Sequence, residues 1–273
     1  MSAAKRQAAL VLWIDVPSNV GNGTTSPGGD AADRFWGLLN ARELPATWTF
    51  ADLASGRLLW DRLLDNAVHE AAIRAVPATR AVESSRDGQI KQVTRQLAAA
   101  AREGCPASSL VLAGNFSAEI AAALRRAGVR SIRVERAVPA KPAGWRAWLG
   151  QLAKRRTVRA AKPRVPQRHG LWEMAVSARL IEADQSSRTS LTIVGREIEL
   201  AARERGVCHA VIELAQCEQL AKRDWRRIES LFDEIAERRS SSGLKVLTAA
   251  QLAAEYAAAT RGVPARSILR RAA

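Results

Sequence analysis

The chain has 273 residues, of which 47% are hydrophobic and 25% are charged, a composition that is typical of a folded globular protein and excludes a largely disordered one. Its 42 Lys and Arg residues outnumber 27 Asp and Glu residues, and the net charge of +15 marks either an anionic partner or an arginine-rich composition without function. No apolar run reaches the ~20 residues of a membrane helix, and three cysteines without metal-ligand spacing indicate a reducing compartment, so we expect a cytoplasmic protein.

Along the chain, short apolar runs alternate with longer runs of helical periodicity. The predicted strands are Ala8–Asp15, Ala46–Phe50, Val68–Arg74, Leu110–Ala113, Ser131–Val134, Leu171–Val176, His209–Leu214 and Leu244–Leu247. The predicted helices are Asp33–Arg42, Arg57–Asn66, Gly88–Glu103, Ala118–Ala127, Leu191–Arg205, Arg223–Arg239 and Ala249–Thr260. This alternation predicts a parallel sheet, open or closed into a barrel, whose ligands bind beyond the carboxyl ends of the strands.

The segment from Ala137 to Gly170 departs from this rhythm. It contains prolines, two tryptophans and many basic residues but no Asp or Glu, which indicates an inserted loop with a short basic helix near residues 145–158. Aromatic and basic residues alternate there as they do on surfaces that bind polyanions or anionic membranes. The anion-binding candidates are Lys154, Arg155, Arg156 and Arg159.

Four motifs occur in an order that resembles one known family. "LVLWIDVPSN" (10–19) ends a predicted strand in an acid, and "ELPATWTF" (43–50) opens the second strand. "NAVHEAAIRA" (66–75) and "GLWEMAVS" (170–177) fall on later strands. Together they resemble the polysaccharide deacetylase family, also called the NodB-homology domain or carbohydrate esterase family four. The resemblance implies an α/β fold, a single distorted (β/α) barrel over residues 1–262 with the insertion 137–170, followed by a basic tail, 263–273.

The resemblance also implies a chemistry that can be checked by position. Active members hold a divalent metal, commonly zinc, with one Asp and two His, beside an Asp that acts as the general base. Asp15 matches that base. Active members also have a late histidine that acts as the general acid. The positions that match the metal ligands and this histidine hold residues that cannot take those roles: Val16, Arg74, Ala78 or Arg80, and Leu214. We therefore expect a degenerate member with no metal or other cofactor, zinc entering only if this placement of the motifs is wrong.

An unpaired carboxylate at a barrel mouth is costly, so we predict that Asp15 forms an ion pair with Arg74, whose guanidinium would fill the volume of the lost metal. The candidate ligand-binding residues at the mouth are Asp15, Trp48, Glu70, Arg74, Asn115, Trp172 and Glu173. A glycosidase-like carboxylate pair drawn from Glu70, Glu173 and Glu213 is a further possibility, because such pairs act at barrel mouths.

Three functions remain open from the sequence. The first is a deacetylase-like protein that has lost metal chemistry and binds a carbohydrate or related ligand at the barrel mouth. The second is an active carbon–nitrogen hydrolase with a rebuilt site. The third is a polyanion-binding module that acts through the basic insertion. The sequence leaves both the ligand and the oligomeric state undetermined.

Overall fold

The computed structural model describes residues 7–17, 29–51, 57–75, 86–104, 106–113, 116–135, 167–181 and 186–261. The strands in this part of the chain are β1 (Ala9–Val16), β2 (Thr47–Phe50), β3 (Glu70–Ala75), β4 (Ser109–Ala113), β5 (Ser131–Glu135), β6 (Gln167–Arg168), β7 (Leu171–Met174), β8 (Ala178–Arg179), β9 (Val207–Glu213) and β10 (Lys245–Leu247). The helices are α1 (Gly29–Ala41), α2 (Arg57–Leu64), α3 (Arg86–Arg102), α4 (Ala118–Arg126), α6 (Ser187–Glu204), α7 (Leu214–Cys217), α8 (Lys222–Ser241) and α9 (Ala249–Arg261).

Every strand and helix predicted from periodicity within these residues is present, with ends that differ by a few residues. The elements that periodicity missed are β6, β8 and α7, which have two to four residues and are too short to show a period. The start of α4 follows its predicted signal, since the Ser117 side chain accepts a hydrogen bond from the backbone N–H of Ile120. Gly128, with φ of +92°, follows the end of that helix as predicted.

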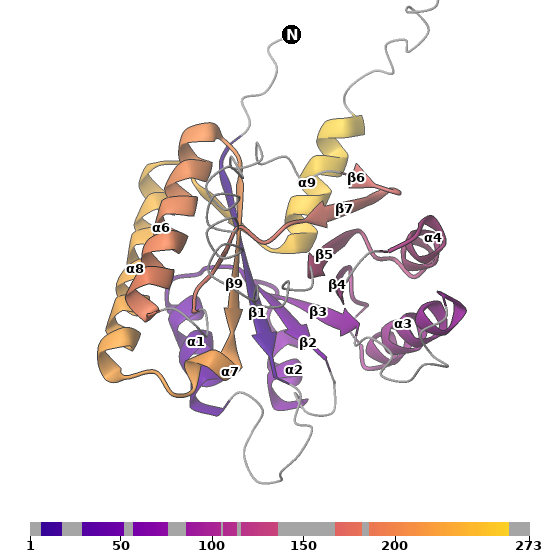
Figure 1. The fold of residues 1–273 in the computed structure, drawn as a ribbon, viewed down its shortest axis with the longest axis horizontal. Helices are drawn as coiled ribbons and strands as arrows, with labels where there is room; N and C mark the ends of the chain where they lie inside the picture. The colour runs from indigo at the N-terminus through magenta and orange to yellow at the C-terminus, as the bar shows by residue number, and fades with distance from the viewer. Residues whose placement is uncertain are drawn as a thin grey trace, which may run out of the picture.

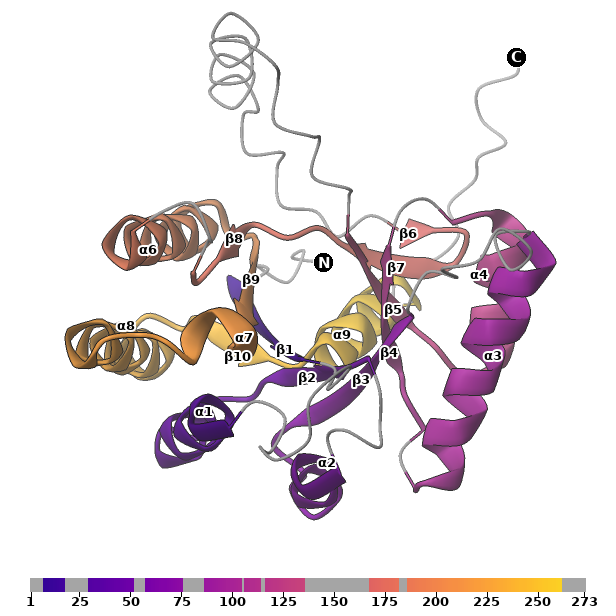
Figure 2. The ribbon, with the colours of Figure 1, turned by 60° about the horizontal axis from the view of Figure 1, so that its bottom comes forward.

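One curved sheet organises the fold (Figure 1). Its ten strands run in the order β6-β7-β5-β4-β3-β2-β1-β9-β8, and β10 pairs with the first part of β1 beside β2. The pairings within the described residues are parallel except for β6 with β7. Figure 2 shows the strands curving around α9, with α1, α2, α3, α4, α6 and α8 on the outside. The result is a distorted (β/α) barrel.

Alternation along each strand separates two apolar cores. In β1, Leu10, Leu12 and Ile14 belong to the outer core, which lies between the sheet and the outer helices. Ala9, Val11 and Trp13 point inward and pack with Leu252 and Ala253 of α9. Asp15 continues this inward series and is the first charged residue in it, so β1 carries its carboxylate to the concave side at the carboxyl end of the strand.

Within the described residues, no helix combines the length and the apolar content of a transmembrane span. The predicted helix near residues 145–158 and the tail 263–273 lie outside the described residues.

Candidate functional site

Three alternate strands of the sheet, β1, β3 and β5, deliver charged side chains to the concave side of the barrel mouth. Asp15 comes from the end of β1, Arg74 from the end of β3, and Arg133 and Glu135 from β5. The register places Arg74 beside Val111 of β4, and Val111 beside Arg133, so the two arginines lie at the same height. We call Asp15, Arg74, Arg133 and Glu135 the mouth cluster.

The mouth cluster is an alternating arrangement of two cations and two anions. The Nη2 atom of Arg133 donates to both oxygens of Asp15, at 2.7 Å each, and to Oε1 of Glu135 at 2.9 Å. The Nη2 atom of Arg74 donates to Oδ2 of Asp15 and, at 3.1 Å, to Oε1 of Glu135. Each carboxylate is therefore shared between two guanidinium groups, and the four formal charges cancel.

Burial within the mouth cluster is graded from the interior to the opening. The side chains of Arg133 and Asp15 are 0% and 5% exposed, whereas those of Glu135 and Arg74 are 23% and 32% exposed. The guanidinium carbon of Arg133 also lies 4.9 Å from the ring centroid of Trp13, which adds a cation–π contact in a desolvated setting. Arg133 therefore forms the base of the mouth cluster, and Arg74 with Glu135 forms its accessible edge.

The predicted ion pair between Asp15 and Arg74 is confirmed. Arg133 and Glu135 were missed. A usable signal was present, because "SIRVE" (131–135) alternates polar with apolar residues and so places Ser131, Arg133 and Glu135 on one face of a strand. In a barrel with apolar outer positions, that face is the interior.

A second ion pair extends the charged surface of the mouth. Arg179 of β8 bonds to Glu213 at the end of β9, and Glu213 is in register with Asp15. Glu213 also accepts a hydrogen bond from Gln216 Nε2 at 3.4 Å. In this second pair, as in the mouth cluster, the carboxylate already accepts a hydrogen bond from a guanidinium group.

The chemistry of these side chains does not suit the zinc ion that the deacetylase resemblance implies. Both oxygens of Asp15 already accept hydrogen bonds from guanidinium groups. Arg74, which the resemblance aligns with a metal-binding histidine, has no side-chain atom that binds a metal ion. Within the described residues, no three His, Cys, Asp or Glu side chains are grouped as metal ligands.

Two buried histidines take no part in the hydrogen bonds of the mouth cluster. His209 faces the interior near the start of β9, and burial together with the positive charge of Arg133 lowers its pKa to about 3. His69 packs against Trp36 and Trp48, which also contact each other, and it accepts a hydrogen bond from the backbone N–H of Ala46. Burial lowers its pKa to about 4. Both are therefore neutral at pH 7.

Glu70 does not lie at the mouth, and the prediction of its place was wrong. It is the first residue of β3 and so lies at the opposite, amino-terminal end of the strand. Its carboxylate accepts hydrogen bonds from Thr47 Oγ1 at 3.0 Å, Ser108 Oγ at 2.9 Å and the backbone N–H of Ala250 at 2.9 Å. Glu70 thus holds the amino terminus of α9, where a negative charge is favourable.

The predicted mouth tryptophans are also elsewhere. Trp48 is fully buried on the outer face of the sheet, because its neighbours Thr47 and Thr49 take the inward positions. Trp172 stands in register with Ser131, at the start of β5, and packs against Tyr256 of α9 with ring centroids 5.1 Å apart. Glu173 follows it and is in register with Ile132, a residue of the outer core. Asn115, Lys154, Arg155, Arg156 and Arg159 lie outside the described residues.

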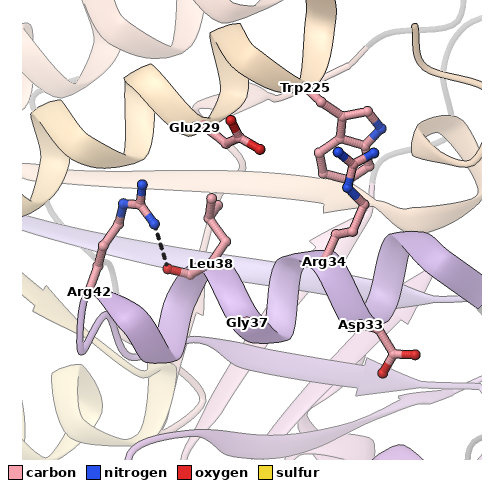
Figure 3. A pocket seen from close by; sticks show the side chains of 7 residues that line it. All are labelled: Asp33, Arg34, Gly37, Leu38, Arg42, Trp225 and Glu229. Carbon is pink, nitrogen blue, oxygen red and sulfur yellow. Dashed lines mark hydrogen bonds between the residues drawn. The ribbon is translucent and has the colours of Figure 1, made fainter. Parts of the chain in front are cut away.

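A groove of about 350 Å³ lies on the outside of the barrel between α1 and α8 (Figure 3). The Arg34 guanidinium stacks 4.3 Å from the centroid of the Trp225 ring at one end, and Arg42 donates to the backbone carbonyl of Leu38 at the other. Arg42 also pairs with Asp233. The groove contains none of the mouth cluster, so it is a separate surface feature between two outer helices.

No family model and no curated protein matches this sequence. Among solved structures, a Mycobacterium smegmatis protein described as a polysaccharide deacetylase superposes with a TM-score of 0.60 at 13% identity, covering 97% of this chain and 94% of that one. A 4-alpha-glucanotransferase from Thermococcus litoralis superposes with a TM-score of 0.57 at 13% identity, covering 95% of this chain and 41% of that one. The chain therefore has the barrel fold of the polysaccharide deacetylases, as the sequence motifs predicted.

Proposed function

We propose that this chain with a polysaccharide deacetylase fold has lost metal-dependent deacetylation and binds a carbohydrate or a related ligand at the mouth of the barrel. The observation that carries the proposal is the sharing of Asp15 between Arg74 and Arg133. Two permanent cations stand around the carboxylate that would serve as the base of an active member.

The loss of deacetylation follows from what a base and a metal each need. A general base must face the substrate with an oxygen free to take a proton, and Asp15 is 5% exposed with both oxygens engaged by guanidinium groups. A divalent cation beside Asp15 would be repelled by two arginines that do not deprotonate in proteins.

The retention of a binding role rests on position. In parallel α/β barrels the carboxyl ends of the strands form the ligand-binding face, and the mouth cluster lies there. Arg74 and Glu135 keep 32% and 23% of their side-chain surface exposed, so charged donors and acceptors remain accessible at that face. Arg179 and Glu213 provide a second pair that is about one-third exposed.

The proposal is tested with purified, untagged protein in three measurements. We expect no stoichiometric zinc by elemental analysis, no zinc-dependent rise in melting temperature, and no release of acetate from acetylated chito-oligosaccharides with or without added zinc. Stoichiometric zinc with a zinc-dependent rise in melting temperature and release of acetate would refute the loss of metal chemistry. Acetate release without bound metal would instead favour the rebuilt hydrolase.

The binding half of the proposal needs its own measurement. We expect an oligosaccharide to shift backbone amide resonances of residues at the ends of β1, β3 and β5 in nuclear magnetic resonance spectra. These shifts should weaken in Arg74→Gln and persist in Glu70→Gln. Glu70 serves as the control because it lies at the opposite end of β3 and contacts α9. Shifts confined to other parts of the molecule would contradict a binding site at the mouth.

A further inference from the structure

The mouth cluster carries more hydrogen-bond donors than its acceptors use. Each guanidinium has five N–H donors. In the part of the chain that the structure describes, the hydrogen bonds of Arg74 and Arg133 all start from Nη2. Arg133 is 0% exposed, and its buried Nε and Nη1 atoms have no hydrogen-bond partner. Unpaired buried donors are costly, so the acceptors of the mouth cluster do not satisfy all of its donors.

Among the described residues, three of the four carboxylate oxygens of the mouth cluster, in contrast, already accept hydrogen bonds. Both oxygens of Asp15 and Oε1 of Glu135 accept from guanidinium groups, and Glu213 accepts from Arg179 and Gln216. A neutral sugar binds largely through hydroxyl groups that need a protein acceptor when they donate. These carboxylates offer such a hydroxyl little, because donating to them competes with charge-assisted hydrogen bonds.

Arg74 is the residue of the mouth cluster whose unused N–H donors a ligand could reach. It is the most exposed member of the mouth cluster, at 32%, and its Nη2 atom alone is tied to Asp15 and Glu135. Its Nε and Nη1 atoms donate to no other residue that the structure describes. The planar donor pair of a guanidinium matches the two oxygens of a carboxylate better than a single hydroxyl. Arg133 lies behind Asp15 and holds that carboxylate from the interior, so Arg74 is the accessible cation of the mouth cluster.

We infer that the ligand of the barrel mouth is an acidic sugar, whose carboxylate binds the outward N–H groups of Arg74; this rests on the proposed function. A uronate residue in an oligosaccharide has the required chemistry. Asp15 and Glu135 then act by holding Arg74 and Arg133 in place, and the ligand supplies the acceptor that the mouth cluster lacks.

The test compares a tetrasaccharide of galacturonate with a neutral tetrasaccharide of galactose by isothermal titration calorimetry at fixed pH and salt. We expect the acidic tetrasaccharide to bind at least about tenfold more tightly. Arg74→Gln should remove at least about tenfold of that affinity, and Arg74→Lys should remove several-fold, because lysine keeps the charge but not the planar donor pair. Arg74→Lys also serves if Arg74→Gln fails to fold, as judged by circular dichroism.

Because the chain carries a net charge of +15, an acidic oligosaccharide could be attracted to it nonspecifically, so the test needs a control that removes one positive charge elsewhere. Arg203→Gln removes the same charge from an exposed position on α6 and should change the affinity less than twofold. An equal loss in Arg203→Gln and Arg74→Gln would overturn the inference. Equal affinity for both tetrasaccharides would overturn it too, while leaving carbohydrate binding intact. Binding of neither also overturns it, and the zinc and acetate measurements then decide the loss of metal chemistry separately.

Discussion

The buried ion pair of Asp15 with Arg133 makes the sharpest prediction for stability. The side chains are 5% and 0% exposed, and Arg133 donates to both oxygens of Asp15 at 2.7 Å. Asp15→Leu leaves a fully buried guanidinium with Glu135 as its remaining acidic partner. Removing one partner of a buried pair costs about 3–5 kcal/mol in the free energy of unfolding. For a chain of this size that lowers the melting temperature by roughly 6–20 °C.

Removing both partners should cost less than the single substitution suggests. In Asp15→Leu/Arg133→Met the buried charges and the unpartnered Nε and Nη1 atoms of Arg133 are gone together. The double-mutant cycle should therefore show a favourable coupling free energy of about 2 kcal/mol between residues 15 and 133.

The assay is urea unfolding at pH 7, followed by far-ultraviolet circular dichroism, for the wild type, both single variants and the double variant. Arg62→Met is the matched control, because Arg62 pairs with Asp33 at side-chain exposures of 49% and 67%, and such a surface pair contributes about 0–1 kcal/mol. A coupling free energy below about 0.5 kcal/mol would refute the reasoning, since two residues in direct contact should be coupled above that value.

Three further outcomes are expected. Glu70→Ala should lower the free energy of unfolding by about 1–3 kcal/mol and reduce hydrogen-exchange protection in α9, because its carboxylate holds the amino terminus of that helix; unchanged protection would contradict this. His69 and His209 have folded-state pKa values of about 4 and about 3, below the unfolded value of 6.5, so the unfolded chain binds more protons and stability falls as pH drops from 6.5 towards those values. Each histidine contributes up to about 1.4 kcal/mol per pH unit to that slope; unfolding measured from pH 7 to 4.5 should give a shallower slope for His69→Asn, and an equal slope would contradict the assignment. Burial raises the pKa of the Cys208 and Cys217 thiols to about 12, so neither should react with iodoacetamide at pH 8 in the folded protein, as read by mass spectrometry; rapid alkylation of either would contradict their burial.

The sequence predicted the order of the elements because that information is local. Each strand and helix shows its own period within a few residues. Strands that alternate with helices along the chain form a parallel sheet. The pairing of Asp15 with Arg74 was also accessible, since both residues end strands that the family resemblance placed close together. The amino-acid sequence alone thus determined the fold class and one half of the mouth cluster.

The errors came from end and face assignment along the sheet. Glu70 and Arg74 lie on the same strand, but one starts it and the other ends it, which puts them on opposite ends of the barrel. Trp48 lies one residue from inward-facing Thr49, and a shift of one residue exchanges the two faces of a strand. A boundary uncertain by two residues is harmless for the fold but decides whether a side chain is in the site.

The composition of the mouth cluster was decided by tertiary structure. Arg133 and Glu135 are 118 and 120 positions from Asp15, and no local pattern relates them to it. They meet because four strands, β2 to β5, pair in a register that brings β5 level with β1 across the curved sheet. The sequence determined which residues are charged at strand ends. The curvature and register of the sheet decided which of those charges share one desolvated space and therefore neutralise each other.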